Sequence, residues 1–366
     1  MDNNRNQVNM AGTQGDNPLD AFRWIIPRII NNGASYADVM RVFRTAYDHE
    51  TWYKEWMDLG RYYEESADNA FDIGNTVTAG EHWNMASTYY RTAQFIVYKD
   101  TPNKRNAYGS SVRCYKKALN TSPFLAEAVE INVGQKFFPG YLTVPSETET
   151  LPVVLVLHGA DSTKEETHSI CENFWKRGLA TLVIDGPGQA EARLRGHMMN
   201  RTFYIEACSA AIDYLESHPR IQNDKIAIWG QCLGGYLAMA VAAHEPRIKA
   251  CASLSAFYYL DTWLKENIPP AFKKNCMYDF GVNTLEELKD KAKEFTLQDV
   301  ITKIRCPLFI VHSTGDHLVP ASEAEQIYNE AVCPKDIKIY EGSVHCCSDI
   351  IPQVRPLMVD WIKNKL

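Results

Sequence analysis

The amino-acid sequence predicts an α/β protein in which a mostly parallel sheet carries helices on both faces and is preceded by a helical domain. After Pro123, short apolar runs alternate with helical segments of ten or more residues, which is typical of parallel strands joined by crossover helices. Before Pro123, aromatic and aliphatic residues recur every three or four positions, as in helices with one buried face. Residues 225–235, KIAIWGQCLGG, predict a strand, a tight glycine turn and a helix, which fits the same architecture.

Length and composition indicate a globular protein with one large core and one smaller unit. The chain has 366 residues, of which 45% are hydrophobic and 23% are charged. Its net charge is −7 and its basic residues are dispersed, which argues against nucleic acid or an anionic membrane as a partner. We find neither a signal peptide nor an apolar run of about 20 residues, so we expect a cytoplasmic protein.

The ten cysteines follow no disulfide framework, and a reducing compartment would keep such thiols free. No CxxC pair or HExxH motif occurs, so the sequence predicts neither a metal site nor a cofactor. Cys346 and Cys347 are adjacent, and we interpret them as two ordinary buried or half-buried thiols.

The first 122 residues divide into a tail and a helical domain. Residues 1–18 are rich in Asn, Gln and Gly and hold hardly any large apolar residues, so we expect a disordered tail. Residues 19–122 are expected to be helical, with aromatic stripes that include Trp52, Trp56 and Tyr89. Such stripes suggest a substrate-binding surface, but they are more often packing faces, and we favour packing.

The predicted α/β core spans residues 123–366. It opens with two alternating segments, typical of an antiparallel hairpin, and continues with strands that alternate with helices. Residues 257–300 are too long for a plain loop, so we expect a helical insertion before the penultimate strand, at the carboxyl edge where ligands bind. The predicted strands, in chain order, are AVEINV, FPGYLTVP, LPVVLVLHG, GLATLVIDG, KIAIWG, IKACASLSA, CPLFIVHSTGD and DIKIYEG.

The segment GQCLG has the form of the GxSxG nucleophile elbow, with Cys232 at its centre. The central residue of such an elbow takes up a strained backbone in a turn so tight that only glycines, here Gly230 and Gly234, fit on either side. A further glycine, Gly235, lets the helix approach the sheet. The start of the helix presents partial positive charge to the sulfur, which favours thiolate over thiol. Cys232 is therefore the candidate nucleophile.

Two further residues complete a candidate triad. Asp316 directly follows an apolar strand, and His345 directly follows the next strand. The order nucleophile, acid, histidine is that of the α/β-hydrolase fold, in which all three meet at the carboxyl edge of the sheet. We expect His345 to shuttle the proton and Asp316 to orient the imidazole, with Asp349 and Asp185 as weaker candidates for the acid.

The oxyanion hole is expected to use two backbone N–H groups. One is that of Leu233, directly after the nucleophile, and the other comes from the loop HGADSTKEE that follows the first parallel strand. Ala160 is the preferred second donor, and its neighbour Asp161 is the alternative. His158 is expected to brace this loop and not to act as a second base.

Several segments together resemble the α/β-hydrolases with an N-terminal helical domain. The group includes the 2,6-dihydroxypseudooxynicotine hydrolases, fungal hydrolases that shorten polyketide pigment precursors, and relatives of the fermentation–respiration switch protein. The resemblance implies hydrolysis of a carbon–carbon bond in a β-dicarbonyl or acyl-aromatic compound, a helical domain that acts as a lid, and a possible homodimer. The segments are WYKEW (52–56), GNTVTAGEHW (74–83), HGADSTKEE, DGPGQAEAR (185–193), the elbow, TGDHLVP and the final histidine.

Cysteine in place of serine leaves three interpretations open. The first is a cysteine-dependent acyl hydrolase that cleaves a carbon–carbon bond next to a carbonyl, or an activated ester or thioester, in a small-molecule substrate. The second is an acyltransferase or cyclase of natural-product biosynthesis that uses the same triad. The third is a non-catalytic binding protein, or a serine hydrolase whose serine was replaced to trap substrate.

Overall fold

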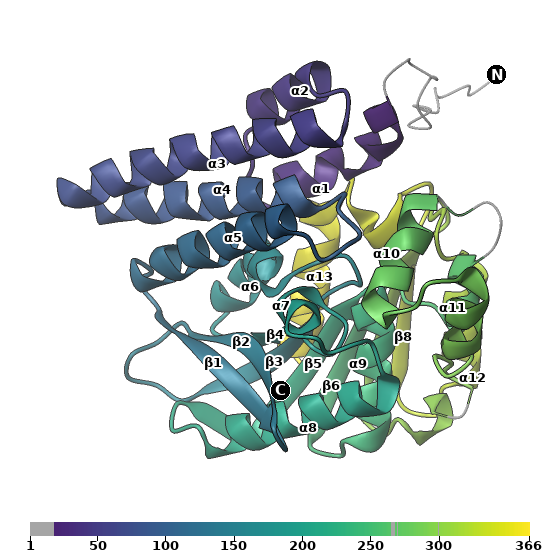
Figure 1. Ribbon diagram of the computed structural model, residues 1–366. Helices are drawn as coiled ribbons and strands as arrows, with labels where there is room; N and C mark the ends of the chain where they lie inside the picture. The colour runs from purple at the N-terminus through teal and green to yellow at the C-terminus, as the bar shows by residue number, and fades with distance from the viewer. Residues whose placement is uncertain (1–17, 265–267, 269, 299) are drawn as a thin grey trace, which may run out of the picture. The chain divides into compact units, whose positions relative to one another are not determined.

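The computed structural model describes residues 18–264, 268, 270–298 and 300–366, and it divides into two compact units (Figure 1). Among the described residues, the first unit comprises 18–97 together with Thr101–Ala118, and the second comprises Tyr98–Asp100 and the described part of Leu119–Leu366. The predicted tail, apart from Pro18, lies outside the described residues, as do positions 265–267, 269 and 299 of the predicted insertion.

The first unit is helical, as its sequence pattern predicts. Its longest helix begins at a capping box, in which the Asp48 side chain accepts from the Thr51 N–H at 2.8 Å. The elements are η1 (Pro18–Ile25), α1 (Ile26–Asn31), α2 (Tyr36–Thr45), α3 (His49–Asp72), α4 (Thr76–Gln94) and α5 (Pro102–Asn120).

The aromatic stripes of the first unit form its core. Trp52 and Trp56 on α3 are fully buried, with ring centroids 5.5 Å apart, and Trp56 contacts Tyr89 of α4 at 5.6 Å. Gly60 allows α3 and α4 to pack closely, because a Cβ there would lie 2.5 Å from the Tyr90 ring. These stripes are therefore packing faces, which confirms the interpretation made from their spacing.

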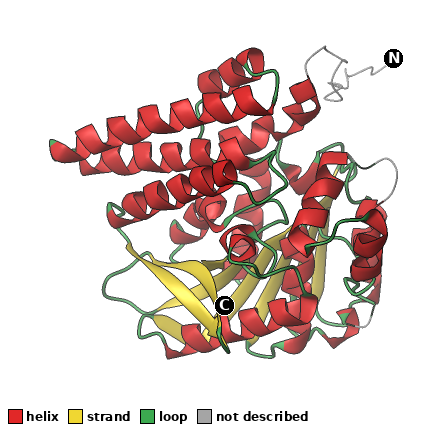
Figure 2. Cartoon of the chain, viewed as in Figure 1, coloured by secondary structure: helices red, strands yellow, loops and turns green. Residues whose placement is uncertain are grey.

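The second unit is built on a sheet of eight strands in the order β1-β2-β4-β3-β5-β6-β7-β8. Figure 2 shows the strands of this sheet in yellow among the helices. The pairs β1–β2 and β2–β4 are antiparallel, and all other neighbours are parallel. The strands are β1 (Leu125–Val133), β2 (Lys136–Val144), β3 (Leu151–Leu157), β4 (Ala180–Ile184), β5 (Ile221–Gln231), β6 (Ile248–Leu254), β7 (Leu308–Ser313) and β8 (Lys335–Tyr340). The fold is that of the α/β-hydrolases, as the sequence predicts.

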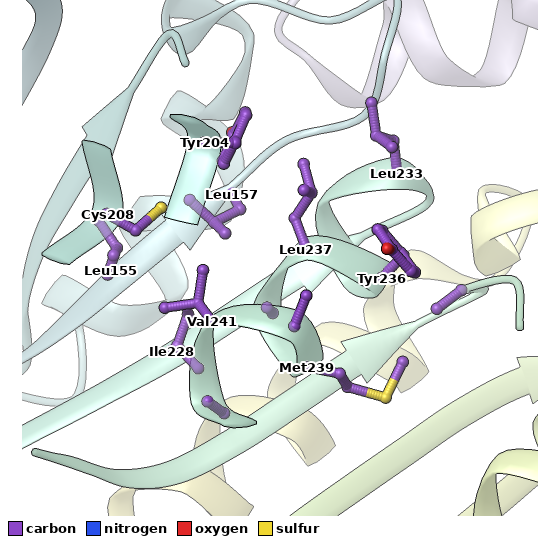
Figure 3. Close-up of a cluster of buried hydrophobic side chains, with 14 of the residues drawn as sticks. Leu155, Leu157, Tyr204, Cys208, Ile228, Leu233, Tyr236, Leu237, Met239 and Val241 are labelled. Atoms are coloured by element: carbon purple, nitrogen blue, oxygen red, sulfur yellow. The ribbon is translucent and has the colours of Figure 1, made fainter. Parts of the chain in front are cut away.

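Helices cover both faces of this sheet, because successive side chains of its central strands are buried on opposite sides. Leu155 and Leu157 of β3 join the cluster formed with α8 and α9, whereas Val154 and Val156 join the cluster formed with α6 and α13. Figure 3 shows the first cluster, where Leu237 and Val241 of α9 lie among side chains from β3, β5 and α8. The helical elements are η2 (Lys164–Thr167), α6 (His168–Trp175), α7 (Ala190–Leu194), α8 (Arg201–Ser217), α9 (Leu233–His244), η3 (Leu260–Leu264), α10 (Pro270–Phe280), α11 (Leu285–Ala292), η4 (Ile301–Lys303), α12 (Ala321–Glu330), η5 (His345–Cys347) and α13 (Ile351–Lys363).

The predicted insertion is helical and lies between β6 and β7, where it contributes η3, α10 and α11, and η4 directly follows it. Its first aromatic residues belong to the core: Phe257 and Tyr258 are fully buried, and Phe257 stacks on Tyr236 of α9 at 4.6 Å. Packing, and not ligand contact, therefore explains these two rings. In the part of the chain that the structure describes, no helix is long and apolar enough to cross a bilayer.

Candidate active site

Cys232 occupies the tight turn between β5 and α9. Its backbone angles, φ 57° and ψ −125°, lie in a region that residues with a Cβ rarely adopt. The turn is held by a hydrogen bond in which the Cys232 N–H donates to the Leu254 carbonyl at 2.8 Å. Such a strained backbone persists only where surrounding contacts fix it, and it places the sulfur at the carboxyl edge of the sheet.

The flanking glycines are required by close backbone approach. A Cβ on Gly230 would lie 2.0 Å from the Gly234 carbonyl oxygen, and one on Gly234 would lie 2.1 Å from the Leu157 oxygen. At Gly235 the nearest atom would be the Ser253 hydroxyl oxygen at 2.8 Å. The structure therefore gives these glycines the steric role that the sequence predicts.

Asp316 and His345 meet at the same edge of the sheet. His345 Nδ1 lies 2.7 Å from Asp316 Oδ2, and Asp316 Oδ1 accepts from the N–H groups of Leu318 and Val319 at 2.9 and 3.0 Å. Burial tends to raise the pKa of Asp316, but the charge of His345 and these hydrogen bonds hold that pKa below its ordinary value. Burial tends to lower the pKa of His345, and the Asp316 charge overcomes this and raises that pKa well above the ordinary value. The ion pair is thus the stable form.

The two weaker candidates for the acid have other partners. Asp349 accepts from the Val344 N–H at 3.2 Å and from the Ser343 hydroxyl, and Asp185 is 3.0 Å from His158 Nε2. Among the candidate carboxylates, Asp316 is the partner of His345.

The thiol of Cys232 is surrounded by groups that stabilise its charged form. A hydrogen bond from the Cys346 thiol is the largest influence; burial opposes it, and the charge of His345 supports it, so that the pKa of Cys232 is lowered to about 6. His345 Nε2 is buried and makes no well-aligned hydrogen bond to any described residue. Because Nδ1 is engaged by Asp316, Nε2 is the nitrogen that remains for Cys232 and its substrate.

Cys346 is a residue of this site that the sequence reasoning missed. Its backbone, with φ 56°, donates a hydrogen bond from its N–H to the Ser255 hydroxyl at 3.0 Å, and the interaction of its thiol with Cys232 raises the pKa of Cys346 well above the ordinary value. Cys347 is different: it is fully buried in the core, and its sulfur lies 4.0 Å from the His312 carbonyl oxygen. The predicted burial of the two thiols is confirmed, since Cys346 is half-buried and Cys347 is buried, but the interpretation did not include the interaction of Cys346 with Cys232. The sequence feature that could have identified Cys346 as a site residue is its position directly after His345.

The loop that follows β3 passes directly beside Cys232. A Cβ on Gly159 would lie 3.4 Å from the Cys232 Cβ and 3.6 Å from its sulfur. Ala160, the next residue, is 5% exposed, and Leu233 is the first residue of α9. The residues expected to supply the oxyanion hole are thus adjacent to Gly159 and Cys232, while the donor roles of the Leu233 and Ala160 N–H groups stay predictions.

A buried polar network braces this loop. His158 is fully buried, with Nδ1 3.0 Å from the Gly159 oxygen and Nε2 facing Asp185. The Gln189 amide donates to the carbonyls of His158 and Gly159 at 3.0 and 3.2 Å. Burial tends to raise the pKa of Asp185, but the Lys164 ammonium at 2.9 Å keeps that pKa well below its ordinary value. His158 therefore has the bracing role that we expect of it.

Within the described residues, no cluster of three or more His, Cys, Asp or Glu side chains is placed to hold a metal ion.

The low pKa of Cys232 predicts a distinctive pH profile of alkylation. Because only the thiolate reacts, the rate of Cys232 modification by iodoacetamide should rise with a midpoint near pH 6 and level off above it. The measurement is mass spectrometry of the Cys232 peptide after short exposures to iodoacetamide. About ten pH values between roughly pH 4.5 and 9 should be used, so that the range includes the ordinary thiol pKa of about 8.5. In Cys346→Ala the midpoint should move upward, and in the neighbouring control Cys347→Ala it should stay. A midpoint near 8.5 in the unaltered protein would contradict the assignment.

Comparisons with known proteins place the chain among hydrolases. The family described as Esterase FrsA-like matches residues 14–366. The chain is 32% identical over 345 residues to the 2,6-dihydropseudooxynicotine hydrolase of Paenarthrobacter nicotinovorans, which covers 93% of this chain and 91% of that protein. An α/β-hydrolase of Xenoacremonium sinensis, xenA, is 29% identical over 72% of this chain and 66% of its own. The crystal structure of the 2,6-dihydroxy-pseudo-oxynicotine hydrolase superimposes with a TM-score of 0.86 at 31% identity, covering 93% of this chain and 95% of that one.

Proposed function

Because the chain belongs to the FrsA-like family of α/β-hydrolases, we propose that it is a cysteine-dependent acyl hydrolase acting through Cys232, His345 and Asp316. Its substrate would be an aromatic or polyketide-like small molecule, cleaved at a carbon–carbon bond next to a carbonyl or at an activated ester or thioester. The observation that carries the proposal is the 2.7 Å contact of His345 Nδ1 with Asp316, with Cys232 held in the elbow beside that pair. A non-catalytic elbow has no need of such a buried ion pair.

The proposed reaction begins with attack of the Cys232 thiolate on the substrate carbonyl carbon. The carbonyl oxygen gains negative charge, which the N–H groups of Leu233 and Ala160 would stabilise. The bond from the carbonyl carbon to the leaving group then breaks, and the leaving group takes the bonding electrons and a proton from His345 Nε2. The acyl group remains as a thioester. Water, deprotonated by the now neutral His345, hydrolyses that thioester and regenerates the thiolate.

The nucleophile restricts the leaving group. In the tetrahedral intermediate, sulfur and the leaving group compete for expulsion, and a thiol of pKa about 8.5 leaves more readily than an alkoxide. Enolate, phenolate and thiolate leaving groups compete well with sulfur because the pKa values of their conjugate acids are similar to, or lower than, the pKa of a thiol. This preference supports β-dicarbonyl compounds, aryl esters and thioesters over plain esters and amides. The names of the curated relatives, which are hydrolases, support the same reaction class.

Acyl transfer is the second candidate, and the cysteine at position 232 favours it. A thioester passes its acyl group to amines, thiols or carbanions more easily than an oxygen ester does. An acceptor bound in place of water would turn the same triad into an acyltransferase or cyclase.

We also propose that residues 19–122 act as a lid. The family resemblance supports this role, whereas the aromatic stripes of that unit are accounted for by its own core.

Intact-protein mass spectrometry tests the proposed function. The protein is incubated with a panel of aryl ketones, β-diketones, aryl esters and acyl thioesters, with Cys232→Ala as the control. A substrate should add its acyl mass to Cys232 and to no other cysteine, and the adduct should decay in water. Faster decay with an added amine or thiol would indicate acyl transfer. An acyl mass that also appears on Cys232→Ala, or turnover by that variant, would reject the proposed nucleophile.

A further inference from the structure

The backbones of Cys232 and Cys346 are anchored to two consecutive residues. The Cys232 N–H donates to the Leu254 carbonyl at 2.8 Å, and the Cys346 N–H donates to the Ser255 hydroxyl at 3.0 Å. Leu254 is the last residue of β6, and Ser255 follows it with φ 50°, a conformation that residues with a Cβ rarely adopt. The end of one strand therefore anchors the backbones of both cysteines at neighbouring points, and the interaction of the two thiols lowers the pKa of Cys232 and raises that of Cys346.

Cys232 is chemically distinct from every other thiol of the chain. The pKa of Cys232 is lowered, whereas the pKa of each remaining thiol is raised, mainly by burial or, for Cys346, by its hydrogen bond to Cys232. The remaining thiols are those of Cys114, Cys171, Cys208, Cys251, Cys276, Cys306, Cys333, Cys346 and Cys347. Peroxides oxidise thiolates far faster than thiols, so an oxidant should select Cys232.

We propose that Cys346 is a resolving thiol, which converts oxidised Cys232 into a disulfide and so makes the oxidation of this site reversible. The oxidant is a hydroperoxide such as hydrogen peroxide. The Cys232 thiolate attacks the peroxide, the O–O bond breaks, and Cys232 becomes a sulfenic acid while hydroxide leaves and takes a proton from His345. The Cys346 sulfur then attacks the sulfenic sulfur, a Cys232–Cys346 disulfide forms, and water leaves with the thiol proton.

The anchoring of both cysteines at the end of β6 favours this second step. The two sulfur atoms have to reach the S–S distance of about 2.05 Å. The hydrogen bonds to Leu254 and Ser255 are donated by the backbone N–H groups of the two cysteines. Rotation of the cysteine side chains about Cα–Cβ therefore leaves these hydrogen bonds in place. A disulfide removes the free sulfur electron pair that the proposed reaction uses, so it should switch the hydrolase off. That loss of activity rests on the proposed function, whereas formation of the disulfide does not.

The test treats the intact protein with a small excess of hydrogen peroxide and follows mass and activity together. The protein should lose the mass of two hydrogen atoms, and a non-reducing digest should contain the Cys232 peptide joined to the Cys346 peptide. Dithiothreitol should restore nearly all of the starting activity. In Cys346→Ala, dimedone should capture a sulfenic acid on Cys232, and continued exposure should give sulfinic and sulfonic acids that dithiothreitol does not reduce. The fraction of its own starting activity that this variant recovers should be about tenfold lower than in the unaltered protein.

The neighbouring Cys347→Ala variant is the matched control, because Cys347 belongs to a different core cluster from Cys232 and its sulfur lies near the His312 carbonyl oxygen. It should form the Cys232–Cys346 disulfide as the unaltered protein does. Cys346→Ser, which keeps a hydroxyl in place of the thiol, replaces Cys346→Ala if that variant does not fold. A digest with a Cys346–Cys347 disulfide, or with Cys232 oxidised irreversibly and no cross-link, would overturn the proposal. If the cross-link forms and activity stays complete, Cys346 is a resolving thiol but Cys232 is not the nucleophile of the hydrolase. If alkylation abolishes activity and peroxide forms no cross-link, Cys232 is needed for activity but Cys346 is not a resolving thiol.

Discussion

Cys232→Ala and His345→Ala should each lower kcat/KM by roughly 10⁴-fold or more on any substrate that acylates the protein. The alanine at position 232 removes the atom that bonds to the acyl group. The alanine at position 345 removes the base for water and the acid for the leaving group, and it also removes the charge that helps to lower the Cys232 pKa. The measurement is steady-state kinetics on purified variants whose unfolding temperatures show that they are folded.

The two losses should not add, because the residues act in one sequence of steps. The double variant should be about as slow as either single variant. Asp316→Asn should cost less, since it keeps a hydrogen bond to His345 while losing the charge that stabilises the imidazolium. Asp349→Asn is the matched control: this aspartate follows His345 closely in sequence but contacts Ser343 and Val344, so kcat/KM should stay within about threefold. Near-full activity of a folded Cys232→Ala variant would show that the triad assignment is wrong.

Cys232→Ser should lower the rate on thioesters and activated ketones by a factor on the order of 10² or more. Serine keeps the elbow geometry, but its hydroxyl is not ionised near neutral pH and depends on His345 as a base during attack. The His345 pKa is raised well above its ordinary value by Asp316, and also by Cys232. These opposite shifts favour a protonated His345 beside a Cys232 thiolate, an arrangement that suits a sulfur nucleophile better than an oxygen nucleophile.

The kinetics of Cys232→Ser should be measured in buffer without acyl acceptors, beside Cys347→Ser as a control for the loss of a thiol elsewhere. Cys347→Ser should keep the kcat of the unaltered protein because Cys347 belongs to a different core cluster from Cys232. A large rise in the hydrolytic rate of Cys232→Ser would identify the protein as a serine hydrolase whose nucleophile had been replaced.

The sequence alone determined the strand and helix order and the candidate residues of the site. Continuous apolar runs, as in LPVVLVLHG, predict strands buried on both faces because each side of the strand needs an apolar cover, and β3 contributes to both core clusters. The glycines around Cys232 could be assigned a role because a tight strand-to-helix turn excludes side chains at fixed positions nearby. The positions of Asp316 and His345 after late strands predicted that they meet, since the carboxyl ends of parallel strands share one edge.

Only the tertiary structure decided which of the neighbouring polar groups face one another. Asp349 is four residues from His345, yet His345 pairs with Asp316, which is 29 positions away, because that carboxylate is fixed by two N–H groups of its own loop. Cys346 and Cys347 are indistinguishable in sequence, and positive φ at both residues turns the first toward Cys232 and the second into the core. The anchor that holds Cys346 is the Ser255 hydroxyl, 91 positions earlier in the chain. Contacts between residues so far apart in the chain depend on the path of the folded backbone, so local sequence patterns do not predict them.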